Sequence, residues 1–453
     1  MQKKDLLPKL ENCSIGVIGL GYVGLPLAIT IAKQKKCFLT KKEIKRNVIG
    51  FDLNEVRINE LENGFDRNKI FSKEIFQKIE NIQFTNEINS LINIDVFIIT
   101  VPTPITKEKQ PDLSFIKKAS KLVGELIKNR EEKSVNPVII FESTVYPGVT
   151  EEICVPIIEK AAGKNYNSEK YKDSFYCGYS PERINPGDKN HTLENIIKIT
   201  SGCNEKVAKW VNSFYGSFIF AGTHMARNIR VAEAAKIIEN TQRDINIALI
   251  NELAILFKKL NIDTKEVLDA ASTKWNFHKY MPGLVGGHCI GVDPYYLTFK
   301  AKEIGYETTL ISAGRSINDY MHEYLVEQIL FHITKREVEV KSEDILLLGL
   351  SYKSNCGDIR NSKLIDLVEI IKNKKLNITI VDPQVDKQEV FRKTGFLCLD
   401  EIPSNKKFTV IILALYHKEF YDLSISKLLE NDSKDTLIFD LTNNLTGSNV
   451  IHL

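Results

Sequence analysis

Long hydrophobic runs are missing from this 453-residue sequence, and its eight cysteines show no regular spacing. The apolar runs, such as ILLLGL at 345–350, have the length of a strand and fall far short of the ~20 residues that cross a membrane. Because no Cys-x-x-Cys pair occurs, we expect neither a metal site nor a disulfide framework. The cysteines are predicted to be reduced thiols in a cytoplasmic protein without membrane association.

Net charge is also nearly absent, since 61 basic and 58 acidic residues leave a formal charge of +3. The short basic stretch TKKEIKR at 40–46 is broken by a glutamate and lacks aromatic residues. Proteins that bind nucleic acid concentrate basic residues in larger patches, so no nucleic-acid partner is expected. The first 19 residues, MQKKDLLPKLENCSIGVIG, are interrupted by charges and a proline, and we expect no signal peptide.

Short β-branched runs alternate with helical stretches toward both ends of the chain, which is the pattern of parallel α/β sheets. Predicted strands lie at 13–19, 47–52, 95–101 and 137–144, and again at 344–350, 377–382, 408–415 and 435–442. The middle of the chain lacks strand periodicity, and residues 231–260 contain no Gly or Pro and repeat apolar residues at helical spacing.

These patterns predict an α/β fold with two Rossmann-like parallel-sheet domains joined by a central helical domain that contains one long bridging helix. We place the amino-terminal sheet domain at 1–224, the helical domain at 225–335 and the carboxy-terminal sheet domain at 336–453.

The stretch GVIGLGYVGLPLA at 16–28 has G-x-G-x-x-G spacing at Gly19, Gly21 and Gly24, directly after a predicted strand. Such glycines permit a tight turn and let the backbone approach a pyrophosphate at the start of a helix. Asp52 ends the next predicted strand, where a carboxylate accepts ribose hydroxyls and repels a 2′-phosphate. We therefore predict NAD rather than NADP; the alternative is a glycine turn without a ligand. The second sheet domain, beginning LLGLSYK, lacks the three glycines, so one NAD per chain is expected.

Ligands of such sheets bind beyond the carboxyl ends of the strands, where this sequence has VPTP at 101–104 and FESTVYPG at 141–148. Thr103 and Thr144 offer hydroxyls there, although either could merely cap the following turn. In the long helix, Lys236 and Asn240 are four residues apart and must share one face. The small and apolar neighbours of Lys236 favour a buried functional pair over a solvated lysine beside a surface asparagine.

The stretch GLVGGHCIGVDP at 283–294 places Cys289 in a glycine-rich loop, four residues before Asp293. A buried structural thiol would not account for the surrounding glycines, which let substrate approach the backbone. Oxidation of a primary alcohol to an acid removes two hydrides, and a thiolate can hold the aldehyde as a thiohemiacetal and then as a thioester that water hydrolyses. Lys236 and Asn240 would stabilise the oxyanions, and Asp293 would orient or activate the water.

The sequence resembles the UDP-sugar 6-dehydrogenases, the family that oxidises C6 of UDP-glucose, UDP-N-acetylglucosamine and their relatives to the uronic acid. Seven motifs in order carry the resemblance over nearly the whole chain: GLGYVGLPLA, VPTP, ESTVYPG, GYSPERINPGD (178–188), EAAKIIENT (233–241), GGHCIGVDP and GLSYKSNCGDIRNS (349–362).

The resemblance implies roles for individual residues. It makes Cys289 the nucleophile, Lys236 and Asn240 the oxyanion partners and Asp293 the residue that positions water, with Thr144 and Glu182 assisting. The implied NAD contacts are Gly19, Gly21, Tyr22, Val23, Gly24, Asp52, Arg57, Thr103, Thr144 and Arg360. The implied contacts of the UDP-sugar are Glu182, Lys236, Asn240, Tyr280, Gly286 and Lys353. The family further implies a homodimer built on the bridging helix, with the carboxy-terminal domain binding the UDP portion.

Two positions depart from the family's UDP-glucose branch. Pro186 stands where that branch has a second glutamate, which leaves open which carboxylate activates water, and Gly291 stands where many relatives have proline. SPERINPGD resembles the branch that acts on UDP-N-acetylhexosamines. We therefore predict NAD-dependent oxidation of UDP-N-acetylglucosamine for a bacterial surface polysaccharide such as capsule or O-antigen. The alternatives are UDP-N-acetylgalactosamine or UDP-glucose as substrate and, more remotely, a two-electron hydroxyacid-type dehydrogenase or a non-catalytic nucleotide-sugar sensor.

Overall fold

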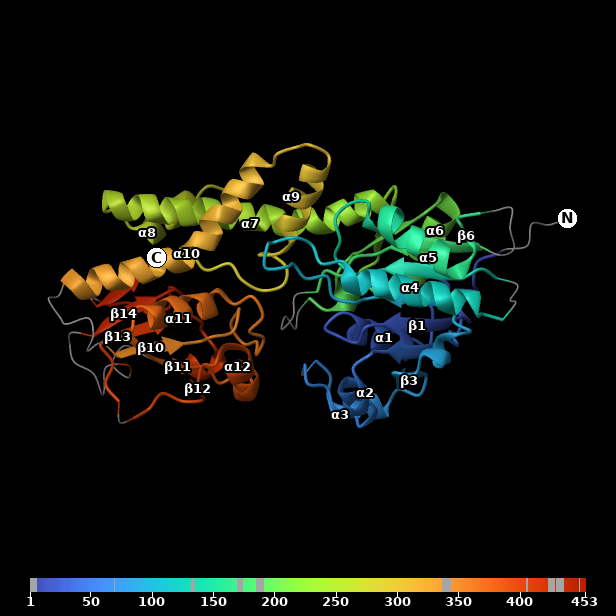
Figure 1. Ribbon diagram of the computed structural model, residues 1–453, viewed down its shortest axis with the longest axis horizontal. Helices are drawn as coiled ribbons and strands as arrows, with labels where there is room; N and C mark the ends of the chain where they lie inside the picture. The colour runs from blue at the N-terminus through green and yellow to red at the C-terminus, as the bar shows by residue number, and fades with distance from the viewer. Residues whose placement is uncertain are drawn as a thin grey trace. The chain divides into compact units, whose positions relative to one another are not determined.

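A computed structural model describes residues 6–68, 70–131, 135–168, 174–184, 191–335, 344–404, 406–422, 428, 436–447 and 449–453. The chain divides into two compact units (Figure 1). Unit 1 comprises Met1–Glu239 and Tyr295–Ile304, and unit 2 comprises Asn240–Pro294 and Gly305–Leu453. The chain therefore leaves unit 1, returns to it for one short segment and ends in unit 2.

Unit 1 is built on a largely parallel sheet with the strand order β3-β2-β1-β4-β5-β7-β8-β9, and β6 pairs with β7 at its side. Only the β7–β8 pair in this order is antiparallel among the described strands. Its strands are β1 (Ser14–Ile18), β2 (Asn47–Phe51), β3 (Ile82–Thr85), β4 (Val96–Ile99), β5 (Val138–Phe141), β6 (Asn165–Tyr166), β7 (Ser174–Tyr179), β8 (Lys198–Gly202) and β9 (Thr223–Met225). The order reverses between β1 and β4, and doubly wound sheets bind their ligands at such a switch point.

Helices cover the faces of this sheet, so β4 and β5 are buried along their whole length. The helices are α1 (Gly24–Lys33), α2 (Glu55–Glu62), α3 (Lys73–Gln77), α4 (Ser114–Lys128), α5 (Val155–Ala162), α6 (Glu205–Gly216) and α9 (Asp293–Glu303), whose residues from Tyr295 onward belong to this unit. A π-helical turn at Val149–Cys154 and 3-10 turns at Ile88–Leu91 and Leu193–Asn195 complete it. Helices α4 and α5 pack side by side (Figure 1), close enough that a Cβ on Gly124 would lie 2.6 Å from the Ala161 Cβ.

Helix α7 runs without interruption from Ile229 to Leu260, a length of 32 residues. Its first part belongs to unit 1 and its last part, from Asn240, to unit 2. The sequence explains this length, because 231–260 contains neither of the two residues that most disfavour a helix interior, Gly and Pro.

Unit 2 has a six-stranded sheet in the order β12-β11-β10-β13-β14-β15, and every pair in it is parallel. The strands are β10 (Asp344–Leu348), β11 (Asn377–Val381), β12 (Cys398–Leu399), β13 (Val410–Leu413), β14 (Leu437–Asp440) and β15 (Val450–His452). The helices are α8 (Thr264–Ala271), α10 (Thr309–Lys335), α11 (Lys363–Asn373) and α12 (Lys387–Thr394), with a 3-10 turn at Lys418–Phe420. Buried residues of α10, α11 and β10, among them Leu325, Leu367 and Leu347, form one apolar core.

The predicted fold class is confirmed, with a parallel-dominated sheet toward each end of the chain and a helical region that contains one long helix between them. The predicted strands at 47–52 and 377–382 correspond to β2 and β11. The strand predicted at 435–442 corresponds to β14, although residue 435 lies outside the described residues. The predicted domain limits at 224 and 335 stay a prediction.

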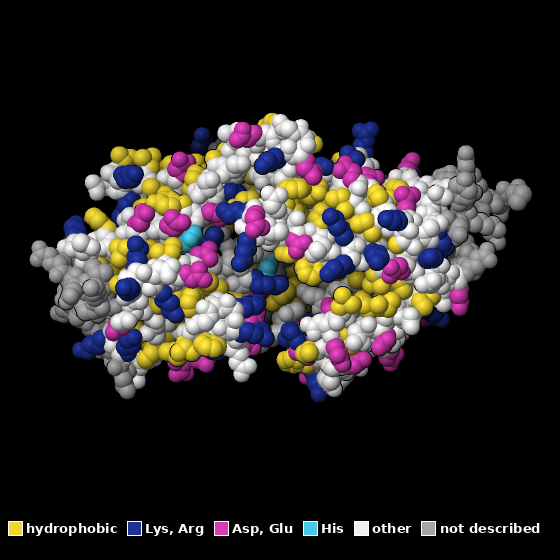
Figure 2. Space-filling view, viewed as in Figure 1, with side chains coloured by type: hydrophobic (Ala, Val, Ile, Leu, Met, Phe, Trp, Pro, Cys, Tyr) yellow, Lys and Arg dark blue, Asp and Glu magenta, His cyan; other side chains and the backbone are white. Residues whose placement is uncertain are grey.

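Surface composition agrees with the near-neutral net charge, since Figure 2 shows acidic and basic side chains intermixed on the face drawn. Within the described part of the chain, none of the helices combines the length and the apolar character that crossing a bilayer requires.

Candidate active site

The turn after β1 has the geometry that a dinucleotide site requires. Gly19 has a φ of +99°, and its N–H donates to the Phe51 carbonyl at 2.8 Å. A Cβ on Gly24 would lie 1.8 Å from the Gly19 carbonyl oxygen, so only glycine fits there, whereas the space around Gly21 is open. The open side leaves room for a pyrophosphate at the start of α1.

Asp52 follows β2 and closes the same turn. Its Oδ2 accepts from the Leu20 N–H at 2.8 Å, and its Oδ1 accepts from the Asn54 N–H at 2.9 Å. A carboxylate oxygen can accept more than one hydrogen bond, and this side chain is partly exposed, so it can also accept from ribose hydroxyls. The turn and its carboxylate therefore fit NAD, which accepts a hydride from carbon when it is bound.

Asp52→Asn is expected to weaken NAD binding by about tenfold, because a neutral amide replaces the charged acceptor. Affinity for the UDP-sugar should stay unchanged, and calorimetric titration of each ligand measures both. Asp263→Asn is the matched control, since this carboxylate also accepts a backbone N–H, at 2.8 Å from Glu266, but does so at the start of α8. Equal NAD affinity in wild type and Asp52→Asn would show that the ribose binds elsewhere.

Arg57 is buried against this turn. Its Nε donates to the Leu20 carbonyl at 3.1 Å, and its Nη2 pairs with Asp66 at 2.9 Å. The guanidinium thus supports the turn, and a direct contact with NAD stays a prediction. Tyr22 and Val23 are partly exposed just before α1.

Thr103 and Thr144 lie beyond the ends of β4 and β5 and contact each other. The Thr103 hydroxyl donates to the Thr144 carbonyl at 2.6 Å. Tyr296, from α9, is fully buried and donates to the Thr103 carbonyl, also at 2.6 Å. Sequence reasoning missed Tyr296, although the pair of tyrosines that follows the VDP motif is a signal that could have been followed.

Glu182 follows β7 and is 8% exposed. Its Oε1 accepts from the N–H groups of Arg183 and Ile184 at 2.6 and 2.8 Å, and its Oε2 accepts from the Lys198 ammonium group at 3.2 Å. The same ammonium group donates to Glu142 at 2.6 Å. Sequence analysis singled out neither Glu142 nor Lys198. A carboxylate directly after a buried strand was the available signal for Glu142. Pro186 lies outside the described residues.

Helix α7 carries Lys236 and Asn240 on one face, one turn apart. Lys236 is 7% exposed, and no described residue makes a hydrogen bond or ion pair with its ammonium group. A buried cation of this kind favours binding of an anionic group. Glu233, one turn earlier, is fully buried and accepts from Gly148 N–H at 2.6 Å and Thr150 N–H at 3.0 Å, which ties α7 to the loop after β5.

In unit 2, the Cys289 loop leads directly into α9. The Cys289 carbonyl accepts from the Asp293 N–H at 2.8 Å, and the Asp293 carboxylate accepts from the Asn240 side chain at 2.6 Å. Asp293 is 2% exposed, whereas Cys289 is the exposed cysteine among the eight, all of which lie within the described residues. Asn240 Nδ2 carries a second hydrogen that remains available for another acceptor. The structure thus brings together Asn240, Asp293 and the backbone of Cys289.

The 349–362 loop of unit 2 contacts this Cys289 loop. His288 Nε2 lies 2.7 Å from Asp358 Oδ2, and the guanidinium group of Arg360 donates to the same carboxylate. Burial by itself raises the pKa of Asp358, but the hydrogen bonds from His288 and Arg360 outweigh it and hold the pKa well below its usual range. A Cβ on Gly287 would lie 2.6 Å from the Tyr352 ring, so glycine is required for this close contact.

Three further predicted residues also lie in unit 2. Gly286 packs against the Asn361 carbonyl, where a Cβ would come within 2.6 Å. Lys353 is partly exposed, with its Nζ 5.7 Å from the centre of the Tyr352 ring, and Tyr280 is partly exposed as well. Contacts of Lys353, Tyr280 and Arg360 with ligands stay predictions.

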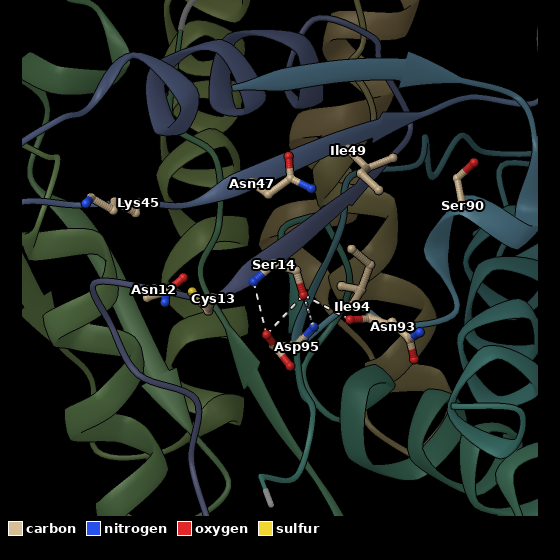
Figure 3. A pocket seen from close by; sticks show the side chains of 10 residues that line it. All are labelled: Asn12, Cys13, Ser14, Lys45, Asn47, Ile49, Ser90, Asn93, Ile94 and Asp95. Carbon is tan, nitrogen blue, oxygen red and sulfur yellow. Dashed lines mark hydrogen bonds between the residues drawn. The ribbon is translucent and has the colours of Figure 1, made fainter. Parts of the chain in front are cut away.

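A separate open cavity of ≈ 400 Å³ lies in unit 1 beside the amino ends of β1, β2 and β4 (Figure 3). Several polar residues line it, among them Asp95, whose carboxylate accepts from Ser14 N–H and Oγ at 3.0 Å and from Arg130 at 2.6 Å. These contacts tie β1 to β4. Because doubly wound sheets bind ligands at the carboxyl ends of their strands, this cavity is not a candidate for the reaction.

The glycine turn and the carboxyl-end threonines of unit 1 are features of a dinucleotide-binding domain, and unit 2 separately carries the exposed thiol in its loop. The sequence matches three profiles of one family: its NAD binding domain over residues 13–219, its central domain over 230–320 and its UDP binding domain over 346–447. The chain belongs to the UDP-glucose/GDP-mannose dehydrogenase family. Its cofactor is NAD.

Relatives match the chain over nearly its full length. It is 45% identical to the UDP-N-acetyl-D-glucosamine 6-dehydrogenase of Pseudomonas aeruginosa, over 95% of this chain and 97% of that one. It is 47% identical to protein CapL of Staphylococcus aureus, over 91% of each. Among solved structures, the UDP-N-acetyl-mannosamine dehydrogenase of Pyrococcus horikoshii superposes with a TM-score of 0.81 at 28% identity, covering 97% of this chain and 98% of that one.

Proposed function

We propose that this protein is a UDP-N-acetylglucosamine 6-dehydrogenase that oxidises the C6 hydroxyl to the carboxylate and reduces two NAD per turnover. The identity of 45% with the Pseudomonas aeruginosa enzyme supports this substrate, because it clearly exceeds the 32% sequence identity with the UDP-N-acetyl-D-mannosamine dehydrogenase of Pyrococcus horikoshii. UDP-N-acetylgalactosamine differs from the proposed substrate in one hydroxyl configuration and is the nearest alternative. The proposed product is a precursor of surface polysaccharide.

We propose covalent catalysis by Cys289 as the mechanism of the four-electron oxidation of the C6 alcohol to the acid. The thiolate adds to the intermediate aldehyde, and the resulting thiohemiacetal carbon carries the hydrogen that leaves in the second oxidation. Water then cleaves the thioester. The single observation that carries this route is a pair of hydrogen bonds in unit 2. The backbone carbonyl of Cys289, the exposed cysteine, accepts from the Asp293 N–H, and the Asp293 carboxylate accepts from the Asn240 side chain.

Other residues take roles that suit their environment. Lys236 provides a buried cation, and Asn240 a free amide hydrogen, for the oxyanions of both tetrahedral states. Asp293, Thr144 and Glu182 orient the hydrolytic water. The UDP portion binds to unit 2 with Lys353, and two chains associate as a homodimer through α7.

The stoichiometry of reduction tests the reaction type. We expect two NADH for each UDP-N-acetylglucosamine consumed, measured by absorbance at limiting sugar together with chromatography of the product. One NADH per sugar would instead identify a two-electron dehydrogenase, and binding without turnover a sensor.

A panel of four substrates tests the sugar: UDP-N-acetylglucosamine, UDP-N-acetylgalactosamine, UDP-N-acetylmannosamine and UDP-glucose. We expect the highest kcat/KM for the first. A higher value for any other sugar would reassign the substrate while leaving the reaction type intact.

A further inference from the structure

A buried charge network lies behind Glu182 in unit 1. Lys198, from β8, is 3% exposed and donates from one ammonium group to Glu142 Oε2 at 2.6 Å and to Glu182 Oε2 at 3.2 Å. Glu142 directly follows β5, is 1% exposed, and also accepts from the hydroxyl of Tyr215 on α6. Among the residues that the structure describes, the charged and titratable groups that face Glu142 are thus Lys198, Glu182 and Tyr215.

Two carboxylates share one cation in this network. Because a single positive charge does not balance both negative charges, one of the carboxylates binds a proton easily. Burial raises the pKa of Glu142 to about 7, Lys198 opposes this rise, and the nearby Glu182 adds to it. Burial alone would lower the pKa of Lys198, but the two carboxylates outweigh it and raise the pKa, so the lysine stays charged. The group that gains or loses a proton near neutral pH is therefore Glu142.

The two carboxylates differ in access. Glu142 is enclosed by the three side chains around it, whereas Glu182 retains some exposure and is aligned by two backbone N–H groups. We infer that Glu142 is a positioning residue for Glu182: through the shared Lys198, the charge on Glu142 sets how strongly Glu182 attracts the proton of the hydrolytic water. This inference rests on the proposed function, in which Glu182 assists hydrolysis of the thioester.

The hydrolytic step shows where this matters. Water adds through its oxygen to the thioester carbonyl, Glu182 takes one water proton, the C–S bond breaks, and Cys289 leaves as the thiolate while the sugar carboxylic acid forms and ionises. No electrons are exchanged with a further reagent. An ionised Glu142 repels the charge of Glu182 and divides the attraction of Lys198, which makes Glu182 the stronger base. When Glu142 is neutral, the charge of Lys198 stabilises only the Glu182 carboxylate, and Glu182 is then the weaker base.

Glu142→Gln tests this inference, because the amide keeps the shape of the side chain and an oxygen for Lys198 but cannot ionise. The measurement is the decay rate of the sugar adduct on Cys289, followed by rapid quenching and mass spectrometry between pH 6 and 8.5. In the wild type we expect decay to accelerate with a midpoint near pH 7. In Glu142→Gln we expect the wild-type rate at pH 6, about three- to tenfold slower decay at pH 8.5, and no midpoint near 7.

Tyr215→Phe supplies a second and opposite variant. In the wild type, the hydrogen bond from the Tyr215 hydroxyl stabilises the ionised form of Glu142. We therefore expect Tyr215→Phe to move the midpoint of adduct decay to higher pH without abolishing the midpoint. A merely structural role would slow decay equally at every pH.

The outcomes separate the two levels of the proposal. An adduct whose decay keeps the wild-type midpoint in both variants overturns the role of Glu142 alone. Absence of any Cys289 adduct in the wild type overturns the proposed function and the inference with it.

Thermal unfolding checks the charge state of Glu142 without turnover. Because the folded state holds its proton up to about pH 7 and the unfolded state releases it near 4.5, the stability that Glu142 contributes falls as pH rises through this window. The Tm of Glu142→Gln relative to wild type should therefore increase from pH 5 to pH 8. A constant difference would contradict the titration of Glu142 in this window.

Discussion

Cys289→Ala is expected to lower the rate of acid formation by more than about 10³-fold, because the Cys289 thiolate is the group proposed to hold the aldehyde for the second oxidation. NAD affinity should stay at the wild-type value, since the proposed NAD contacts include the glycine turn and Asp52 but not the thiol. Acid production in single-turnover experiments and calorimetric titration of NAD measure the two effects.

Cys203→Ala is the matched control for this variant. Cys203 is partly buried in unit 1 and has no proposed part in the reaction, so its removal should leave acid formation unchanged. If Cys289→Ala still formed acid at the wild-type rate, the covalent route would be wrong even though the family assignment would stand. A release of free aldehyde by Cys289→Ala would support the route, because it shows the first oxidation proceeding without the second.

Local sequence patterns were sufficient to predict the fold class, because the apolar positions along the chain reflect which residues are buried. Strands such as β4 and β5 are apolar at every position, and a parallel sheet covered on both faces produces that pattern. The predicted strands nevertheless extend too far: 137–144 includes Glu142 and Thr144, whereas β5 ends at Phe141. The polar residues after the last buried position belong to the loops where ligands bind.

The glycine turn could also be predicted in detail, because each requirement is local. Gly19 and Gly24 come into contact within one turn of chain, and Asp52 reaches Leu20 from the adjacent parallel strand. The sequence therefore contains both the reason for each glycine and the position of the carboxylate.

The remainder of the candidate site depends on contacts between distant segments, which no local pattern encodes. Lys198 and Glu142 are 56 residues apart, and His288 and Asp358 are 70 residues apart. From the sequence, Lys198 at the start of a strand is expected to be exposed. Only the fold shows that two buried carboxylates, Glu142 and Glu182, lie beside it. Motif resemblance identified the segments that meet, GGHCIGVDP and GLSYKSNCGDIRNS, but not that His288 would bond to Asp358.

The other large expected effect concerns stability, and it arises from a buried polar network between α7 and α10. Arg315 is 3% exposed and pairs with Asp244, which is fully buried and accepts from the Asn318 side chain at 2.7 Å. The Asn318 side chain in turn accepts from the Asn251 side chain at 2.8 Å, and Asn251 Oδ1 accepts from the Gly283 N–H at 2.8 Å. The network thus fixes the beginning of the Cys289 loop to α7 and α10.

Arg315→Met is expected to lower the free energy of unfolding by about 3–5 kcal/mol, because it leaves Asp244 buried without its cation. Hydrogen exchange followed by mass spectrometry should show faster exchange in α10 and, through Asn251, at the amide of Gly283. Lys265→Met is the control: it removes an exposed cation from the Lys265–Asp269 pair in the same unit and should leave exchange in α10 unchanged.

The pH dependence of the Arg315→Met defect distinguishes a lost charge pair from lost packing. Burial already raises the pKa of Asp244, while Arg315 and Asn318 oppose that rise. Removing Arg315 raises the pKa further, so the folded variant binds a proton that the unfolded chain has released, and its stability falls as pH rises above the unfolded value near 4. The stability difference from wild type should therefore widen between pH 5 and pH 8. A difference that stays constant over this range would mean that the methionine fails through packing alone, and that Asp244 does not depend on Arg315 for its charge.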